Sequence, residues 1–322
     1  MSGVDRETAS AGTQVILGEQ FGPVPLTVDE HVVKCYAFAQ DDYSARYAAD
    51  GRAVAHPLLL GNHLLRVYEE RHERHVNSGA LHTQEEVWYS SPVLIGERVM
   101  ISGRYVDAYT RRGRPYLVLE SSAHGEDGRL LLRHRATEAL GAAGDLTAVD
   151  QDGRVIDLEN RAGQPTAERV TGEVDLTIPA VSRAHPAVMP GTALVPLRKR
   201  LTQEQMSVFS GAGQYERNLH TDLESARGAG LERPIAQGLQ VAGHISELLA
   251  GFFGTSWFTS GWQRIKFVKP VPAGEALTVH GVVRAMRPVA GELCAELEVW
   301  VVDSVGDRTA IGWATGTVSS GC

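Results

Sequence analysis

Two stretches of this chain repeat one another, and this internal repeat limits the possible folds more than any other feature of the sequence. Residues 91–97 (SPVLIGE) resemble residues 269–275 (KPVPAGE), and their glycines lie 178 positions apart. The turn-rich segments 125–129 and 304–308 lie at nearly the same spacing, each between two strand-like runs. The repeat predicts two halves with one order of elements: a short helix, an irregular loop, a long apolar helix and several strands.

The length of the chain agrees with such a duplication. Its 322 residues are enough for two domains of about 150 residues each. We expect a first half over residues 15–140, which is the degenerate or substrate-binding half, and a second half over residues 191–322. Between them, residues 141–190 mix Asp, Gly, Ala and Pro without sustained periodicity. This composition predicts a long linker or crossover that packs across a surface.

Each half is predicted to contain a long apolar helix. In the second half, apolar residues recur every three or four positions between Gly238 and Gly254, and these glycines are typical of helix boundaries. In the first half the helix is predicted to begin at Pro57 and to become strongly charged after Tyr68.

Shorter signals complete the two halves. Thr27 and Thr202 each stand shortly before an acidic residue and a short apolar stretch, so we expect them to cap two short helices. Alternation of apolar and polar residues over 296–301 and 309–318 predicts antiparallel strands with one buried face.

Composition excludes several classes of protein. Hydrophobic residues make up 43% and charged residues 22% of the chain, as in ordinary globular proteins. The 31 basic and 39 acidic residues give a net charge of -8, which argues against nucleic acid or an anionic membrane as the main partner. No apolar run approaches the ~18 residues of a membrane helix, and residues 1–14 lack the features of a signal peptide. We therefore expect a cytoplasmic protein.

Sequence motifs for metals and cofactors are missing. The three cysteines, Cys35, Cys294 and Cys322, are widely spaced, which fits neither a disulfide framework nor a zinc knuckle. No cluster of His, Cys and Asp has the spacing of metal ligands. A phosphate-binding loop, a dinucleotide-binding glycine motif and a nucleophile elbow are also missing. We expect neither a metal nor a cofactor.

One loop of the second half carries a combination of residues that is typical of catalysis. Residues 209–222 read FSGAGQYERNLHTD and are followed by the start of the long helix. The arrangement resembles the MaoC-like or R-specific enoyl-thioester hydratase family. The signature of that family joins Ser-Gly-Asp, an Asn, a His, an Asp two residues later and a His-Gly or similar pair at the start of the central helix. Asn218, His220, Asp222 and Gly238 match this signature by their spacing.

The resemblance implies an α+β fold, a double hotdog in which each half wraps an antiparallel sheet around a long central helix. It implies a dehydratase or hydratase that acts at the α–β bond of an acyl thioester on coenzyme A or acyl carrier protein, in a chain that could form a homodimer. In that role the imidazole of His220 takes or gives a proton. The backbone N–H of Gly238, at a helix N-terminus, meets the thioester oxygen as it becomes enolate-like.

The chain departs from the family pattern in both halves. Ala212 stands where an Asp normally follows Ser-Gly, and Glu216 is the nearby acidic residue that can replace it. The first half has Asp41 five residues before Arg46, which is the Asp-to-His spacing of the family with the His replaced.

His56 stands at the entrance of the first long helix, where the second half has Gln237, and it can supply an imidazole to the first half. The candidate catalytic residues are therefore His220, Glu216, Gly238, Asp41 and His56, and the candidate substrate-binding residues are Asn218, Asp222, Gln237 and Tyr215. We expect a tunnel beside the second long helix that leads to His220.

The candidates of the second half have structural alternatives. His220 fits a ring that only forms a hydrogen bond with the backbone of a loop. Glu216 fits a surface ion pair with Arg217 as well as it fits catalysis. Asn218 and Asp222 are residue types that commonly hold loops and helix caps through local hydrogen bonds.

The same holds in the first half. Asp41 and Asp42 fit solvated loop acids equally well, and His56 fits a helix cap. The remaining histidines that we interpret as structural or surface residues are His63, His72, His75, His244 and His280.

Four functions follow from these features. The first is the acyl-thioester dehydratase or hydratase. The missing Asp after Ser210-Gly211 favours a diverged lyase, cyclase or conjugate-addition enzyme of specialised metabolism. A hotdog thioesterase fits the loop less closely. A non-catalytic acyl-binding module would explain why both halves have lost part of the signature.

Overall fold

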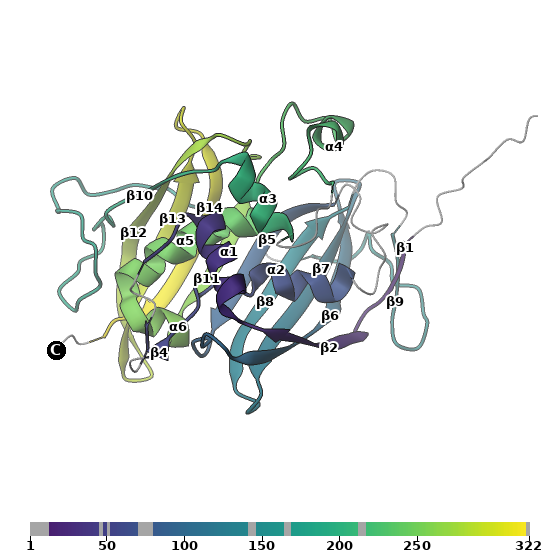
Figure 1. Ribbon diagram of the computed structural model, residues 1–322, viewed down its shortest axis with the longest axis horizontal. Helices are drawn as coiled ribbons and strands as arrows, with labels where there is room; N and C mark the ends of the chain where they lie inside the picture. The colour runs from purple at the N-terminus through teal and green to yellow at the C-terminus, as the bar shows by residue number, and fades with distance from the viewer. Residues whose placement is uncertain are drawn as a thin grey trace, which may run out of the picture.

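One antiparallel sheet of ten strands runs through the whole molecule (Figure 1). The computed structural model describes residues 13–44, 48–49, 52–69, 80–140, 146–163, 169–211 and 217–319. The strands of this sheet, in spatial order, are β10 (Leu197–Arg200), β12 (Ala276–Val289), β13 (Glu292–Val302), β14 (Arg308–Thr317), β11 (Trp262–Phe267), β5 (Leu81–Tyr89), β8 (Leu130–Ala139), β7 (Arg114–Gly125), β6 (Arg98–Arg111) and β2 (Gln20–Thr27).

The sheet contains the predicted repeat in three dimensions. Five strands come from each half, and the order outward from the centre is β5-β8-β7-β6-β2 on one side and β11-β14-β13-β12-β10 on the other. The halves join where β5 pairs with β11 in an antiparallel register from Trp88 and Trp262 to Gln84 and Lys266. A continuous sheet therefore crosses the boundary between the halves.

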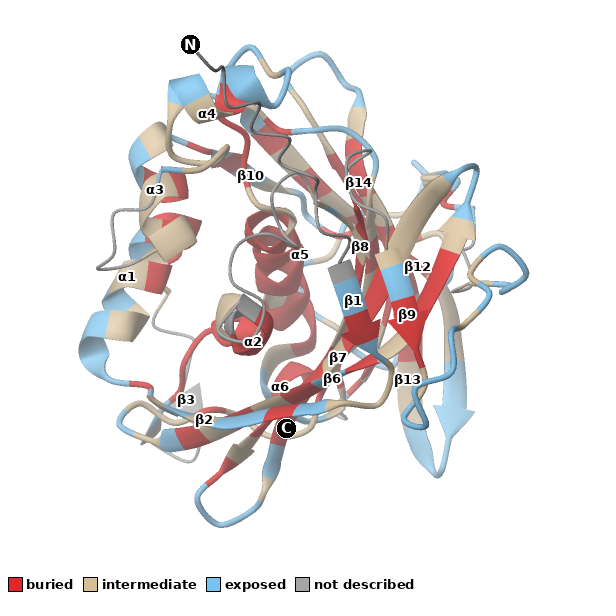
Figure 2. Cartoon of the chain, turned by 90° about the vertical axis from the view of Figure 1, so that its right-hand side faces the viewer, coloured by how far each residue is buried: buried red, intermediate tan, exposed pale blue. Residues whose placement is uncertain are grey.

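Helices cover one face of this sheet in two layers (Figure 2). The central helices α2 (Gly61–Glu69) and α5 (Gly238–Phe253) lie nearer to the sheet, and α1 (Glu30–Gln40) and α3 (Gln203–Gly211) lie outside them. The remaining elements are β1 (Thr13–Ile16), β3 (Ala48–Ala49), β4 (Arg52–Ala53), β9 (Leu146–Val149), α4 (Leu223–Gly228), η1 (Gly254–Ser256) and α6 (Trp257–Ser260).

The helix of the second half has the predicted bounds, whereas that of the first half begins later than predicted. α5 begins at Gly238 and is followed by Gly254, and nearly all of its side chains are buried. Residues 57–60 form a turn instead of helix, because the N–H of Gly61 donates to the carbonyl of Leu58, a bond that spans three residues. α2 therefore starts at Gly61, four residues after the predicted Pro57.

Of the two predicted helix caps, one is confirmed. The hydroxyl of Thr202 accepts from the N–H of Gln205, and the side chain of Gln205 accepts from the N–H of Thr202, which is a reciprocal capping box. In the first half the prediction of Thr27 was wrong. Asp29 caps α1 instead, since its carboxylate accepts from the N–H of Val32 at 2.9 Å.

The segment between the halves packs against both of them. β9 pairs with β1 in parallel, on the side of the first half. Further along, the N–H groups of Thr171 and Gly172 donate to the carboxylate of Glu298 on β13, and Arg308 donates to the carbonyl of Val170. The segment therefore forms contacts with the sheet of the second half as well.

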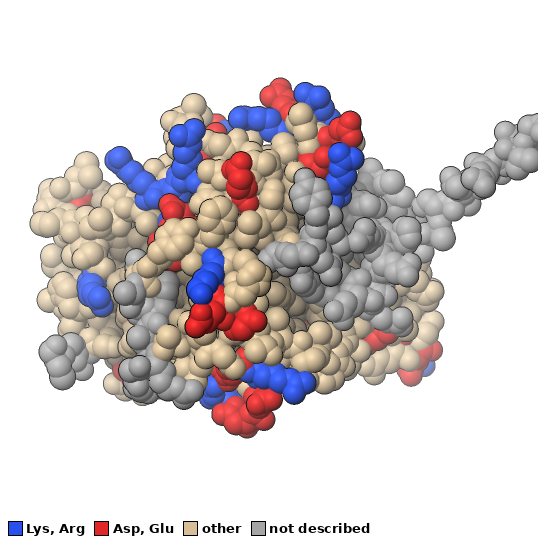
Figure 3. All heavy atoms as spheres, viewed as in Figure 1, with Lys and Arg blue, Asp and Glu red and all other residues tan. Residues whose placement is uncertain are grey.

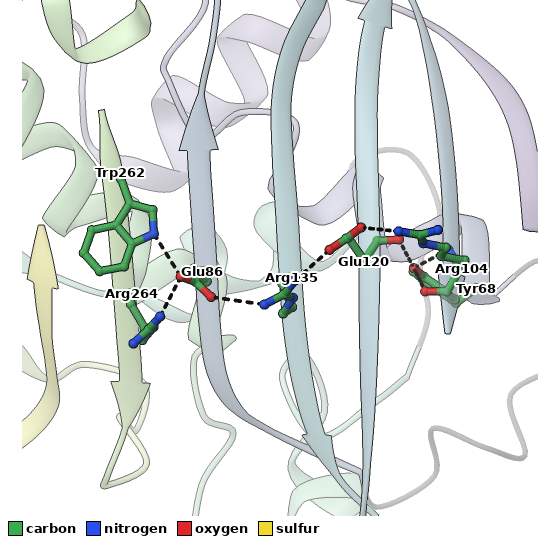
Figure 4. A network of polar contacts seen from close by, with 7 residues as sticks. All are labelled: Tyr68, Glu86, Arg104, Glu120, Arg135, Trp262 and Arg264. Atoms are coloured by element: carbon green, nitrogen blue, oxygen red, sulfur yellow. Dashed lines mark hydrogen bonds and ion pairs between the residues drawn. The ribbon is translucent and has the colours of Figure 1, made fainter. Parts of the chain in front are cut away.

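The other face of the sheet carries a network of charged side chains across the junction (Figure 4). Glu86 on β5 accepts from Trp262 and Arg264 on β11, at 3.0 and 2.9 Å. Arg135 on β8 lies 3.7 Å from the carboxylate of Glu86 and donates to that of Glu120 on β7 at 2.9 Å. The network therefore joins side chains of the two halves on the surface opposite the helices.

Basic and acidic side chains intermingle on the face shown in Figure 3. Among the described residues, no helix combines the length and the apolar character that crossing a membrane requires.

The repeated turns supply a test of the fold. Gly96 and Gly274 have φ angles of 90° and 87°, and a Cβ added to either would contact nothing within 4 Å. Gly274→Ala is therefore expected to lower the free energy of unfolding by about 1–2 kcal/mol through backbone strain alone. Urea unfolding measures this loss. Gly228→Ala is the control, because that helical glycine lacks a positive φ and also has open space; an equal loss in both variants would contradict the argument.

Candidate active site

The imidazole of His220 is fixed in one orientation. Its Nδ1 lies 2.7 Å from the backbone oxygen of Ile235. Because a carbonyl only accepts, Nδ1 carries the hydrogen in the neutral ring, and Nε2 holds the lone pair. Burial lowers the pKa of His220 below its usual value, and the hydrogen bond to Ile235 acts in the opposite direction. The ring is therefore set up to accept a proton at Nε2.

Three neighbours hold the loop that carries this ring. The side-chain oxygen of Asn218 accepts from the N–H of His220 at 2.9 Å, and the amide of Gln203 on α3 donates to the carbonyl of His220. Asp222 caps α4, and the hydrogen bond from the N–H of Ser225 lowers the pKa of its carboxyl. Asn218 and Asp222 thus have the predicted loop and cap functions, and their role in substrate binding stays a prediction.

The N-terminus of α5 lies beside this loop. Ile235, which holds the ring of His220, stands three residues before Gly238. Gln237 occupies the N-cap position without a side-chain cap bond, because its amide donates to the hydroxyl of Ser210 at 3.1 Å. Among the described residues, no acceptor takes the N–H of Gly238.

Gly238 is also the residue that the local packing requires. A Cβ at this position would lie 2.6 Å from the ring of Phe267 on β11, closer than packed atoms allow. The absence of a side chain leaves room for the ring below and exposes the backbone N–H, so an oxygen with developing negative charge can approach the positive end of a helix of 16 residues.

Two predicted residues of this half, Tyr215 and Glu216, lie outside the described residues. Their roles stay predictions. Two cavities are described below, and His220 lines neither of them. The tunnel to His220 therefore also stays a prediction.

In the first half, the acid that faces His56 is Asp42 and not Asp41. Asp41 ends α1 in the left-handed conformation, with φ of 51°, and its side chain is exposed. Asp42 is 6% exposed, and its Oδ2 lies 3.6 Å from Nε2 of His56. The structure therefore brings Asp42 to His56 and leaves Asp41 exposed, so the catalytic role of Asp41 stays a prediction without support from this geometry. The interpretation of Asp42 as a solvated loop acid was wrong.

His56 combines a backbone contact with this carboxylate contact. Its Nδ1 accepts from the N–H of Leu58 at 3.2 Å in the turn before α2. The proton of the neutral ring therefore stands on Nε2, which faces Asp42. The ring therefore holds the turn before α2 and does not cap the helix, which begins at Gly61.

Two further charged residues, Lys199 and Glu247, lie near this pair. Lys199 on β10 forms a buried ion pair of 2.8 Å with Glu247 on α5, and it donates to the backbone oxygen of Asp41 at 2.7 Å. The carboxylates of Glu247 and Asp42 and the ring of His56 each have an atom within 4.8 Å of the other two. The first half therefore holds a buried acid–base cluster to which the second half contributes.

His244 on α5 belongs to the same region and is 1% exposed, which agrees with the structural interpretation and excludes the surface one. Neither ring nitrogen has a hydrogen-bond partner in the described part of the chain. Burial lowers its pKa well below the usual value, and the charges of Lys199 and His56 act in the same direction. A signal was present in the sequence: Gln240, His244 and Glu247 form one polar stripe on an otherwise apolar helix.

A cavity of about 200 Å³ opens next to this cluster, between α1, α3 and the start of α2. Tyr36 lies in its wall, and the centre of the Tyr36 ring is 5.0 Å from that of His56. Burial raises the pKa of Tyr36 well above its usual value, so its hydroxyl keeps its proton. A second cavity of about 210 Å³ includes Glu247 in its wall, on the side of residues 181–197.

Comparisons with known proteins agree with the predicted resemblance. Residues 187–303 match the family model described as a MaoC like domain. No curated protein sequence matches the chain. The resemblance to the MaoC-like family is confirmed.

Solved structures show the same fold. A MaoC-like dehydratase is 18% identical, with a TM-score of 0.69 and coverage of 95% of this chain and 98% of that one. The full-length peroxisomal multifunctional enzyme type 2 from Drosophila melanogaster is 17% identical, with a TM-score of 0.61 over 93% of this chain and 48% of that enzyme. A conserved hypothetical protein from Mycobacterium tuberculosis with a double hotdog fold is 14% identical, with a TM-score of 0.58 over 94% and 96%. The fold is the predicted α+β double hotdog.

Proposed function

Because this chain is a double hotdog with a MaoC-like domain at residues 187–303, we propose that it is an acyl-thioester hydratase or dehydratase of the α–β bond. The observation that carries the proposal is the 2.7 Å hydrogen bond between His220 and Ile235. It fixes a proton-accepting nitrogen next to the open N-terminus of α5. A base and an oxyanion donor are the two groups that this chemistry needs.

The proposed hydration uses these two groups. Nε2 of His220 takes a proton from water, and the hydroxide oxygen forms a bond to the β-carbon. The electron pair of the double bond moves toward the thioester carbonyl, whose oxygen becomes negative and accepts from the N–H of Gly238. The α-carbon then takes the proton back from His220, and dehydration follows the same steps in reverse. Glu216 would assist as a second acid or base.

The substrate would be an acyl group carried by coenzyme A or acyl carrier protein. The test is to mix the tag-free full-length chain with crotonyl-CoA and longer enoyl-CoA substrates and to follow the loss of enoyl absorbance. Enzymatic hydration supports the proposal. Tight binding of an enoyl-CoA without turnover would instead favour the non-catalytic acyl-binding module.

One observation favours a second candidate, the diverged lyase or cyclase. The Asp42 and His56 pair is a buried carboxylate and imidazole, and the ring of Tyr36 separates His56 from a cavity of about 200 Å³. Such a pair can give and take a proton from the first half. If His56→Gln abolishes turnover while His220→Gln does not, the reaction belongs to the first half.

The pH dependence of the hydration gives a further test. Burial lowers the pKa of His220 below 6.5, so the neutral ring persists to a lower pH than a solvent-exposed histidine allows. The acid limb of kcat/KM for crotonyl-CoA is therefore expected below pH 6.5. Initial rates across a pH series measure it, and an acid limb above pH 6.5 would show that His220 does not control the limb.

A further inference from the structure

A second buried polar cluster lies on the helix-facing side of the sheet, apart from the candidate site. It consists of His82 and Glu85 on β5 and His134 on β8, and one ligand atom of each lies within 4.8 Å of the others. Glu85 is 0% exposed and His134 is 1% exposed. Groups of this kind are rarely buried unless they are paired or bind a metal.

The sheet itself brings these three side chains together. β5 has a register irregularity directly after His82, where Thr83 is the extra residue. An extra residue reverses the alternation of side chains along a strand, so His82 and Glu85 share one face although they are three positions apart. His134 lies two positions from the residue that pairs with Glu85, which makes the two side chains diagonal neighbours.

Several polar atoms of the cluster lack partners. Nε2 of His134 and Oε2 of Glu85 are 3.8 Å apart, too far for a hydrogen bond. Within the described part of the chain, neither atom has a hydrogen-bond partner, and the same is true of the side-chain oxygen of Gln263. Gln263 on β11 is fully buried, and its amide donates to the other oxygen of Glu85 at 3.4 Å. Two oxygens and one nitrogen are thus left unsatisfied in one place.

The ring of His82 has the orientation of a metal ligand. Its Nε2 lies 3.0 Å from the backbone oxygen of Gln84, so Nε2 carries the hydrogen and Nδ1 keeps the lone pair. Histidines that bind metals usually donate their other N–H to a carbonyl or carboxylate in this way.

We propose that His82, Glu85 and His134 bind a divalent transition-metal ion, with Zn²⁺ as the best match and the side-chain oxygen of Gln263 as the fourth ligand. Imidazole nitrogens suit zinc and not magnesium or calcium. Two histidines with one carboxylate are a known zinc ligand set, and a closed fourth position is typical of structural sites. The ligands come from three strands, which explains why spacing along the sequence predicted no metal site.

The ion would stabilise the junction of the two halves. It would join β8, β5 and β11, which are neighbours in the sheet (Figure 4). The ring of His82 also lies 5.2 Å from the ring of Phe267, which occupies the space below Gly238. The site would therefore hold Phe267 in place beneath the N-terminus of α5 without contacting the substrate.

The test uses the tag-free full-length chain after treatment with a chelator. Titration with ZnCl₂ is expected to give one bound ion per chain and a higher midpoint of thermal unfolding. CoCl₂ is expected to give the visible absorption of a four-coordinate ion. A chain that binds no Zn²⁺ at micromolar concentration would overturn the proposal and leave a buried imidazole and carboxylate pair.

Two ligand variants and two controls locate the ion. Glu85→Gln and His134→Gln are each expected to weaken Zn²⁺ binding by about 100-fold or more, since even outer neighbours of a metal site contribute about 10–100-fold. His185→Gln, on the surface, and His56→Gln, in the other buried group of histidine and carboxylates, are expected to bind as the unchanged chain does. Binding that survives both ligand variants, or is lost in His56→Gln, would overturn the assignment.

If the ligand variants do not fold, a measurement on the chain without substitutions still tests the proposal. X-ray absorption of the zinc-loaded protein is expected to show two imidazole ligands with oxygen in the remaining positions. A first shell without imidazole would overturn the proposal. None of these measurements depends on hydratase activity, so the metal site and the proposed function stand or fall separately.

Discussion

The variant His220→Gln is expected to lower kcat/KM for the hydration of crotonyl-CoA by about 10²–10⁴-fold, the range for loss of a general acid–base group. A glutamine amide can still donate to the carbonyl of Ile235, so the loop keeps its anchor while the proton-accepting nitrogen is lost. Initial rates of enoyl absorbance loss measure the effect. Because the group acts in the chemical step, the decrease is expected in kcat more than in KM.

The control for this variant is His185→Gln, which changes an exposed histidine in the segment between the halves. It is expected to keep the rate of the unchanged chain. Thermal unfolding of both variants separates loss of chemistry from loss of structure. Full activity in His220→Gln would remove His220 from the mechanism and transfer the acid–base role to the Asp42 and His56 pair.

The second large effect is expected on stability, from Lys199→Met. The Lys199 and Glu247 side chains are only 4% and 5% exposed, and their charged groups are 2.8 Å apart. Removal of the ammonium would leave the carboxylate of Glu247 without its cation inside the protein. Loss of one partner of a buried ion pair typically costs about 3–5 kcal/mol. Urea unfolding monitored by circular dichroism measures this loss.

Two comparisons sharpen the result. In Lys199→Met with Glu247→Leu, most of the loss is expected to be restored, because an apolar pair of similar volume often replaces a buried ion pair without net cost. Lys34→Met breaks an ion pair with Glu30 that is exposed on both sides, and no measurable change is expected. A double variant as unstable as Lys199→Met alone would show that the apolar pair does not fit.

Local patterns predicted the parts of the fold that depend on neighbouring residues. The apolar period between Gly238 and Gly254 gave α5, and Thr202 gave the cap of α3. The sequence repeat predicted the two halves, because equivalent turns at Gly96 and Gly274 both require a glycine with a positive φ. These features are set by a few consecutive residues, so the sequence carries them directly.

The site depends on details that spacing does not contain. Asp41 and Asp42 are adjacent and chemically identical, and the left-handed end of α1 decides which carboxylate points inward. The cluster around His56 includes residues from β10 and α5, more than 140 positions away. Contacts across such distances follow from the packing of the two halves, and a pattern within one half does not reveal them.

The sheet junction has a consequence for how the two halves could diverge. Positions 86 and 264 are equivalent in the repeat and face each other where β5 pairs with β11. The equivalent positions 85 and 263 are diagonal neighbours there, because Glu85 pairs with Ile265 and Gln263 pairs with Val87. In a symmetric homodimer position 86 would face its own copy and position 85 would lie diagonal to its own, so two glutamates or two arginines would repel each other. Within one chain, Glu85 meets the amide of Gln263 and Glu86 meets the guanidinium of Arg264. A junction within one chain is therefore free of the self-complementarity that a symmetric dimer requires, and here one half supplies the acceptors and the other the donors.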